Sequence, residues 1–263
     1  MNNKRKTSIS WVEAGKIYLR GYEIEDLIGN ISLGEAIFLV LTGRLPKKEE
    51  ALLIEAIMIS VIDHGVSPPS TIVTVTATNT GAGLNAAVAA GILTINKFHG
   101  GAIEEAMTAI HEAYSLQTTD ELSEEEAAER VIESHIESGL RVSGFGHRFH
   151  GEDPRTVSLF SFAEELGFSG KFVSQAKAIE KVFKEKFGKD LPINADGAIA
   201  ALLCEMNFPK VLANGLFIAS RVIGLIAHAI EERNHPPMKT VKIDEYDYEG
   251  ELGKEFRRNE DFE

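Results

Sequence analysis

A glycine-rich basic segment, residues 141–155, carries the side chains best suited to bind an anion. It contains three glycines, two histidines, three arginines and one proline, so it does not form one regular helix. Glycines let backbone N–H groups approach a ligand, and arginines bind carboxylates or phosphates through paired hydrogen bonds. The alternative is a solvated basic turn, which is less favoured because the rest of the chain is acidic. The segment therefore indicates a site for an anionic ligand.

A histidine and an aspartate elsewhere in the chain are candidates for acid–base chemistry. His99 precedes a predicted helix, residues 102–114, where free N–H groups and the helix dipole disfavour a protonated ring. A neutral imidazole there can donate a hydrogen bond to a developing oxyanion, and a purely structural role at the helix start fits the segment equally well. Asp196 lies where a loop becomes a helix, so it is either an N-cap or a general base. The segment alone favours the N-cap.

Two further side chains are candidates for binding carboxylates. Arg221 is embedded in the apolar run of residues 216–226, and a buried guanidinium is costly unless a carboxylate of the protein or of a ligand pairs with it. His64 ends a predicted helix, where its ring can also interact only with the helix dipole. His228 follows Arg221 on the same predicted helix and is either solvated or packed.

Length, composition and charge exclude several classes of protein. The chain has 263 residues, 44% of them hydrophobic, which is enough for one large domain or two smaller ones. Its 27 basic and 40 acidic residues give a net charge of −13, which disfavours nucleic acid and anionic membranes as partners. A single cysteine, Cys204, excludes an internal disulfide and a cysteine-rich metal site and fits a reducing compartment. With no signal-like stretch and no run of 18 apolar residues, we expect a cytoplasmic protein without a membrane span or a bound metal.

Helical periodicity dominates the chain. The pattern predicts a short β-hairpin near the N-terminus and helices along most of the remaining length. The hairpin is expected at residues 8–20, and the helices at residues 33–41, 47–63, 86–93, 102–114, 127–140, 155–166, 171–187, 198–206 and 210–232.

Residues 70–80 are rich in β-branched side chains and are predicted to form a strand. The strand would lead into Gly81-Ala-Gly83-Leu-Asn-Ala86 and a helix, which imitates a dinucleotide-binding fingerprint. That fingerprint also needs a second strand and an acidic residue about 20 positions further on, and neither follows here. An oxidoreductase that uses a nucleotide is therefore a weak alternative, and close helix packing is the simpler role for these small residues.

Several short motifs, in order, resemble the citrate synthase superfamily over nearly the whole chain. The resemblance implies a mainly α, citrate synthase-like fold with a large domain and a smaller mobile domain, in a homodimer. By this resemblance the large domain comprises residues 1–101 and 210–263, and the small domain comprises residues 102–209. Length and sequence detail look closest to citryl-CoA lyases, which are similar to the C-terminal module of ATP-citrate lyase. The motifs are YLRGYEIEDL at 18–27, GRLP at 43–46, DHG at 63–65, TGA at 80–82, FHGG at 98–101, GFGH at 144–147, DPR at 153–155 and NAD at 194–196.

The resemblance also implies a role for each candidate residue. Asp196 would remove the α-proton of an acetyl thioester, His99 would hold the enol oxygen, and His147 would polarise the ketone of oxaloacetate. The same groups, run in reverse, would cleave citryl-CoA. No tightly bound cofactor is implied, because the coenzyme A thioester is a substrate. The residues implied to bind carboxylates are His64, Arg155 and Arg221, and those implied to contact coenzyme A are Gly144, Phe145, Gly146 and Arg148.

The chain departs from the synthase pattern near its C-terminus. Synthases have a further arginine in an RPR-like segment contributed across the dimer, whereas residues 234–240 here read NHPPMKT. Lys239, Arg233 or His235 would have to replace that arginine. The loop from His147 to Arg155 is also one residue shorter, with Gly151 where synthases often place a basic contact to coenzyme A. The alternatives are therefore a citrate or 2-methylcitrate-type synthase and, from another class, a non-catalytic helical partner subunit.

Overall fold

The computed structural model describes residues 5–146 and 153–238, and helices dominate this part of the chain. The predicted mainly α fold is confirmed. In chain order the elements are β1 (Ser10–Glu13), β2 (Lys16–Leu19), β3 (Tyr22–Glu23), α1 (Ile24–Leu27), α2 (Leu33–Thr42), α3 (Lys48–Val61), α4 (Pro69–Asn79), α5 (Leu84–Ile92), α6 (Ala102–Thr119), α7 (Glu124–Glu137), α8 (Pro154–Glu165), α9 (Lys171–Glu185), α10 (Ala195–Glu205), the 3-10 helix η1 (Lys210–Leu212) and α11 (Ala213–Glu232).

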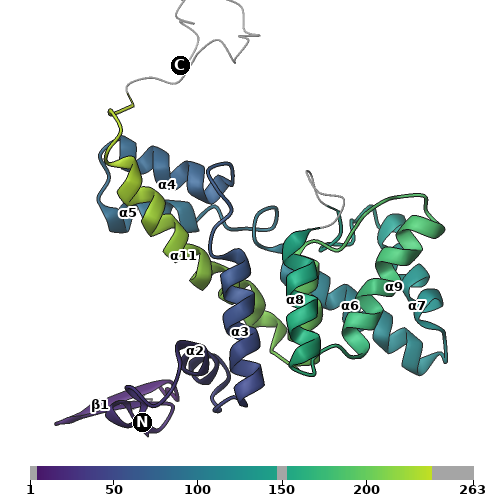
Figure 1. Ribbon diagram of the computed structural model, residues 1–263, viewed down its shortest axis with the longest axis horizontal. Helices are drawn as coiled ribbons and strands as arrows, with labels where there is room; N and C mark the ends of the chain where they lie inside the picture. Colours follow the sequence, from purple (N-terminus) through teal and green to yellow (C-terminus); the bar gives the residue numbers. More distant parts are fainter. Residues whose placement is uncertain (1–4, 147–152, 239–263) are drawn as a thin grey trace, which may run out of the picture.

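The helices form two groups that meet along α3, α8 and α11 (Figure 1). Helices α6 to α10 pack on one another, while α4 and α5 pack on α11, and α2 packs on α3. The predicted hairpin is confirmed as β1 and β2, with Trp11 opposite Tyr18, and β3 extends it to three antiparallel strands. Helices α6 to α10 lie within the predicted small domain, residues 102–209, whose independent movement stays a prediction.

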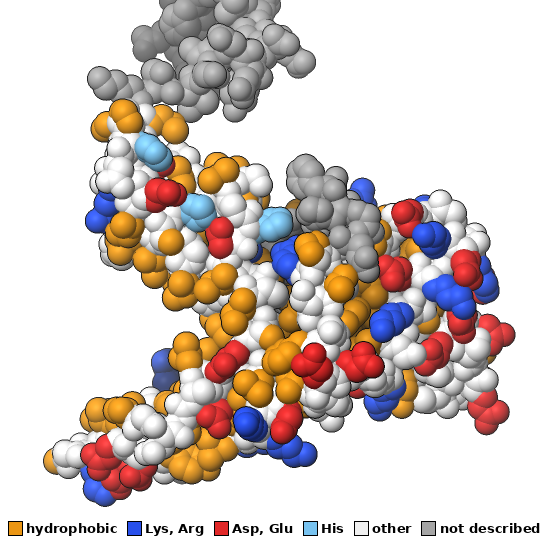
Figure 2. Space-filling view, in the orientation of Figure 1, with side chains coloured by type: hydrophobic (Ala, Val, Ile, Leu, Met, Phe, Trp, Pro, Cys, Tyr) orange, Lys and Arg blue, Asp and Glu red, His pale blue; other side chains and the backbone are white. Residues whose placement is uncertain are grey.

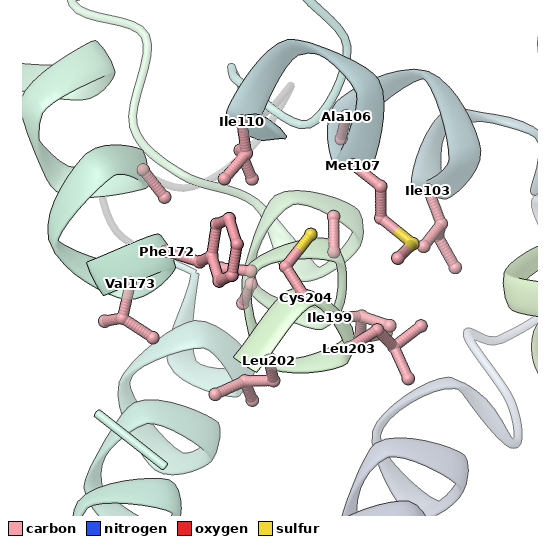
Figure 3. Close-up of a cluster of buried hydrophobic side chains, with 14 of the residues drawn as sticks. Ile103, Ala106, Met107, Ile110, Phe172, Val173, Ile199, Leu202, Leu203 and Cys204 are labelled. Carbon is pink, nitrogen blue, oxygen red and sulfur yellow. The ribbon is translucent and has the colours of Figure 1, made fainter. Parts of the chain in front are cut away.

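Helix α10 is the centre of the group formed by α6 to α10. Every residue from Gly197 to Cys204 is buried, because the sequence GAIAALLC is apolar around the whole helix rather than along one stripe. Figure 3 shows Ile199, Leu202, Leu203 and Cys204 of α10 packed against side chains of α6 and α9. Close packing on all sides holds the first turn of α10 in place, and Asp196 lies in that turn.

The strand predicted at residues 70–80 is wrong, because these residues form helix α4. β-branched residues lower helix propensity only slightly, so tertiary packing decides the outcome. Pro69 occupies the first turn, and the hydroxyl of Thr78 donates to the carbonyl oxygen of Thr74 at 2.9 Å. Gly91 of α5 packs closely on α4, since a Cβ there would lie 2.0 Å from the Thr74 hydroxyl oxygen. Without the strand, the dinucleotide-binding alternative is wrong too, and close helix packing accounts for the small residues.

Helix α11 runs through the middle of the fold (Figure 1). Together with η1 it is long and apolar enough to cross a membrane by length and composition alone, with a mean hydropathy of 1.6. The core helix of a soluble protein passes the same test, and here α11 contacts α3, α4, α5 and α6. The expected absence of a membrane span stays a prediction. The consequence for the site is that Arg221, on α11, is buried between these helices.

Candidate active site

One cavity of about 350 Å³ brings together side chains from five separate parts of the sequence. It lies where the loop after α3, the turn before α6, the start of α8, the start of α10 and the middle of α11 meet. Gly146, at the end of the glycine-rich segment, also contributes to its wall. The predicted site residues that line this cavity are His64, His99, Gly146, Arg155, Asp196 and Arg221.

Asp196 is not the N-cap of α10, so the role favoured by its local sequence is wrong. Asn194 is the cap, and its side-chain oxygen accepts hydrogen bonds from the backbone N–H groups of Asp196 at 3.0 Å and Gly197 at 3.2 Å. The carboxyl group of Asp196 instead lines the cavity. Burial raises its pKa, against the opposing charges of Arg155 and Arg221. A carboxyl group in this state exchanges protons closer to neutral pH than an ordinary aspartate does.

Hydrogen bonds hold the glycine-rich segment against the start of α10. The backbone N–H of Asn194 donates to the carbonyl oxygen of Gly144 at 3.0 Å, and the Asn194 side-chain nitrogen donates to that of Gly146 at 2.9 Å. Gly144 has a φ of +90°, and a Cβ there would lie 2.7 Å from the Cα of Gly197. Gly144 therefore lets the segment approach α10, whereas the sequence suggested approach to a ligand. His147 and Arg148 lie outside the described residues.

A second cavity of about 410 Å³ lies on the other side of the same segment. Gly146 lines both cavities. The ring of Phe145 lines the second one and packs against Phe183, with ring centroids 5.9 Å apart. Two cationic side chains, Arg141 and Lys189, are at its wall. This cavity is thus partly aromatic, partly basic and adjacent to the first.

His99 is held by a tight turn and by a serine that the sequence did not reveal. The backbone N–H of His99 donates to the carbonyl oxygen of Asn96 at 2.9 Å, and Gly100 follows with a φ of +74°. The Nε2 atom of His99 lies 2.8 Å from the hydroxyl oxygen of the buried Ser70 on α4. Burial, with the nearby charge of Arg221, lowers the pKa of His99, so the ring is neutral near neutral pH. This agrees with the neutral imidazole expected before a helix.

Arg221 is a buried cation without a salt bridge among the residues that the structure describes. Only 2% of it is exposed, and its Nε donates to the carbonyl oxygen of Val61 at 3.0 Å. Its guanidinium carbon lies 4.8 Å from the ring centroid of Phe217, which also packs edge-on against His99. The Nη1 atom is buried and has no hydrogen-bond partner in the described part of the chain. Burial lowers the pKa of Arg221, because a guanidinium group removed from water loses the solvation of its charge.

Arg155 is oriented by Asp153, which the sequence placed in the DPR motif without assigning it a role in the site. The Nε and Nη2 atoms of Arg155 donate to the two carboxylate oxygens of Asp153 at 3.0 and 2.7 Å. Asp153 is buried, caps α8 and also accepts a hydrogen bond from the backbone N–H of Ala195 at 3.2 Å. Burial acts to raise the pKa of Asp153, but its hydrogen bonds and ion pair with Arg155 lower it overall. An aspartate directly before a helix-starting proline was the available signal.

No cluster of three or more metal-ligating side chains occurs within residues 5–146 and 153–238. The expectation of a metal-free site stays a prediction. The arrangement offers one carboxyl group with a raised pKa, one neutral imidazole and two guanidinium groups around a common space. Such a set suits proton transfer to or from a bound ligand that the arginines hold by its anionic groups.

Comparison with known proteins assigns the chain to a family. Residues 47–242 match the model of the citrate synthase C-terminal domain, so the chain belongs to the citrate synthase family. It is similar to the solved structure of citryl-CoA lyase from Hydrogenobacter thermophilus, with 37% identity, a TM-score of 0.87, and 96% of this chain and 97% of that chain covered.

Curated relatives are longer than this chain. It is 27% identical to ATP-citrate synthase beta chain protein 1 of Oryza sativa subsp. japonica over 76% of this chain and 34% of the relative. It is 31% identical to the citrate synthase of Haloferax volcanii over 73% of this chain and 49% of the relative. The chain therefore spans about a third to a half of the length of these relatives.

Proposed function

We propose that this protein cleaves citryl-CoA into acetyl-CoA and oxaloacetate. The observation that carries the proposal is the meeting of Asp196, His99, Arg155 and Arg221 on one cavity. His147, the predicted partner of the hydroxyl group, directly follows Gly146, which also lines that cavity. Similarity to a citryl-CoA lyase along nearly the full length of both chains supports the same substrate.

The arginines bind the acidic half of the substrate. The Nη1 atom of Arg221 needs an acceptor, and a substrate carboxylate supplies one while neutralising the buried charge. Arg155 is fixed by Asp153, so its remaining donor atoms reach a second carboxylate without losing side-chain entropy on binding. His64 completes the carboxylate-binding wall. A planar guanidinium fixes the orientation of a carboxylate in a way that lysine does not.

Cleavage proceeds as a retro-aldol reaction in the proposed mechanism. His147 accepts the proton of the citryl hydroxyl group, and the C–O bond becomes the ketone of oxaloacetate as the C–C bond breaks. The electron pair of that bond enters the thioester and forms an enolate, whose oxygen accepts a hydrogen bond from His99. Asp196, as the carboxylic acid, then protonates the enolate carbon and gives the methyl group of acetyl-CoA. The raised pKa of Asp196 keeps this proton available at higher pH than in an ordinary aspartate.

Coenzyme A extends from the first cavity into the second in this proposal. Gly146 lies at the junction of the two, so a thioester in one leaves the pantetheine arm near the other. Arg141 and Lys189 supply positive charge for the phosphates, and Phe145 supplies an apolar surface. In this proposal Gly144 lets the segment pack closely on α10 and does not contact the ligand.

Ser70→Ala is expected to lower kcat by roughly tenfold to a hundredfold with a small change in KM. When the hydroxyl of Ser70 donates to Nε2 of His99, the proton of the neutral ring lies on Nδ1, which is then the donor to the enolate. Without the hydroxyl, the ring loses this tautomer preference and its orientation. Steady-state kinetics with citryl-CoA measure the effect, and Thr80→Ala, at the exposed end of the same helix, is the matched control. A variant with unchanged kcat would contradict the role of Ser70.

Arg155→Ala is expected to weaken oxaloacetate binding about a hundredfold and to leave coenzyme A binding unchanged. The variant removes a donor to the acid and also removes the ion pair between Arg155 and the buried Asp153. Isothermal titration calorimetry with each ligand separately measures the two affinities. Equal losses for both ligands would contradict the assignment of Arg155 to the acid.

Citrate synthesis is the second candidate function, and similarity to the citrate synthase of Haloferax volcanii favours it. The same side chains catalyse the aldol direction, with Asp196 as base and hydrolysis of the citryl thioester as a further step. Assays with citryl-CoA and, separately, with acetyl-CoA plus oxaloacetate distinguish the two. Turnover of neither would support the non-catalytic helical partner subunit instead.

We propose that the chain pairs with a second copy of itself. We also propose that the protein is cytoplasmic. Large apolar side chains are exposed on neighbouring helices, and Figure 2 shows hydrophobic side chains gathered along the middle of the molecule, over α3 and α11. A homodimer buries such a surface without a new partner. Analytical ultracentrifugation tests this, and a monomer at micromolar concentration would contradict it. The exposed residues on α3, α4 and α11, or directly after α3, include Ile59, Ile62, Ile72, Ile223, Ile226 and Ile230.

A further inference from the structure

One face of α11 contacts the end of α3 and the turn that follows it. Arg221, Gly224 and His228 are spaced by three and four residues, so they lie on the same side of the helix. Arg221 donates from Nε to the carbonyl oxygen of Val61 at 3.0 Å. The Nε2 atom of His228 lies 2.9 Å from Oδ1 of Asp63, two residues further along the chain. Successive positions on α11 therefore contact successive positions of the chain that leads to His64.

Gly224 permits this close contact. A Cβ at Gly224 would lie 2.4 Å from the carbonyl oxygen of Ile62 and 3.0 Å from Oδ1 of Asp63. No side chain fits there without moving the two helices apart. The backbone of α11 thus lies directly against residues 62–63.

Asp63 connects His228 to the turn that carries His64. While Oδ1 of Asp63 pairs with His228, its Oδ2 accepts a hydrogen bond from the backbone N–H of Gly65 at 2.8 Å. Gly65 has a φ of +74°, the left-handed conformation that reverses the chain after His64. The side chain of His228 is only 15% exposed, whereas that of Asp63 is 38% exposed, so the bond is shielded from water on the histidine side alone. The carboxylate of Asp63 also favours the charged form of Arg221 electrostatically.

We propose that His228 is a positioning residue for the acid-binding wall of the site, acting through Asp63 on His64 and Arg221. This inference rests on the proposed function, because it assigns His228 to the carboxylate half of that cavity. His228 itself does not line the cavity within the described part of the chain. Its contribution is to fix the turn at 63–65, which holds His64 at the wall, and to keep Asp63 near the buried guanidinium.

His228→Ala is expected to reduce oxaloacetate affinity roughly tenfold to a hundredfold while coenzyme A affinity is unchanged. His228→Gln is expected to restore most of the affinity, because the amide nitrogen of glutamine reaches a position close to that of Nε2. His111→Ala is the matched control, since His111 is an exposed histidine of α6 that lines neither cavity. Calorimetry with each ligand gives the affinities. In a His64→Ala background, the further change caused by His228→Ala is expected to be much smaller.

Hydrogen exchange of the Gly65 amide tests the same inference without a ligand. In His228→Ala the exchange rate of this amide is expected to rise at least about tenfold, while amides within α4 and α5 keep their rates. Unchanged Gly65 exchange, or equal losses of oxaloacetate and coenzyme A affinity, would overturn the inference. A wild-type protein that does not turn over citryl-CoA would overturn the proposed function instead, while the exchange measurement would still decide whether His228 holds the turn.

Discussion

Asp196→Asn is expected to lower the turnover of citryl-CoA by about 10³-fold while the protein stays folded and still binds oxaloacetate. Asparagine has nearly the same shape, but its amide cannot deliver a proton to the enolate carbon. The cap of α10 is unaffected, because Asn194 and not Asp196 provides it. Kinetics and calorimetry on the same preparation measure the two effects. Asp190→Asn, at an exposed position close in sequence, is the matched control, and an Asp196→Asn variant with wild-type turnover would remove Asp196 as the proton donor.

The same variant is also expected to change how the stability of the protein depends on pH. Burial raises the pKa of Asp196 above its ordinary value of 3.8, so the folded state holds this proton more tightly than the unfolded state. Below pH 3.8 both states are protonated and the group contributes nothing. As the pH rises above that value, the unfolded state ionises first and the native state loses stability. The free energy of unfolding of Asp196→Asn is therefore expected to exceed that of the wild type at neutral pH, with the difference shrinking as the pH falls toward 4.

Arg221→Met is expected to abolish tight oxaloacetate binding without destabilising the fold. The variant removes a buried charge that has no salt bridge among the described residues, and methionine fills a similar volume against Phe217. Loss of a buried charged hydrogen bond to the acid is worth about 2–5 kcal/mol. This corresponds to at least about a thirtyfold loss of affinity. The free energy of unfolding is expected to stay equal or to rise.

Calorimetry with oxaloacetate and denaturation by urea measure these two quantities. Arg130→Met is the matched control, because Arg130 is an exposed arginine paired with Asp120. Arg221→Lys is not expected to restore binding, since an ammonium group does not reproduce the planar donors. Unchanged affinity in Arg221→Met would contradict the assignment of Arg221 to the substrate, and a strong loss of stability would indicate a purely structural role.

The helices were predictable because their signals are local. Apolar spacing and terminal signals placed most of them within a few residues. The helix predicted at residues 33–41 begins directly after Ser32, which caps it through a reciprocal hydrogen-bond pair with Glu35. The strand predicted at residues 70–80 failed because β-branched side chains were weighed without their environment. In α4 the hydroxyl group of Thr78 bonds within the helix, and Thr74 lies against Gly91 of α5. Local propensity was overruled there by packing against α5.

The residues that line the candidate site could be predicted from the sequence, but the side chains that pair with them could not. His99, Arg155, Asp196 and Arg221 could be found from residue type and position, and the family resemblance connected them. The side chains that hold them in place could not be found in this way. Ser70, for example, lies 29 positions before His99, and nothing in either segment indicates that the two are in contact. His228 and Asp63 are 165 positions apart. Such pairs depend on helix packing, which the local sequence does not encode.

The N-cap of α10 shows a different limit of prediction from the sequence. Asn194 and Asp196 are both good N-cap residues, and they are separated by one position. Which of them caps depends on where the helix begins, and that is set by the hydrogen bonds between Asn194 and the glycine-rich segment. With these bonds in place, the side chain of Asn194 bonds to backbone groups, and the carboxyl group of Asp196 faces the cavity.

Incubation of the purified wild-type protein with citryl-CoA in deuterium oxide tests the central claim most directly. The account predicts acetyl-CoA and oxaloacetate in equal amounts, with one deuteron in each newly formed methyl group, because Asp196 passes a solvent-derived proton to the enolate carbon. Recovery of intact citryl-CoA, or its conversion to citrate and coenzyme A alone, would contradict the account.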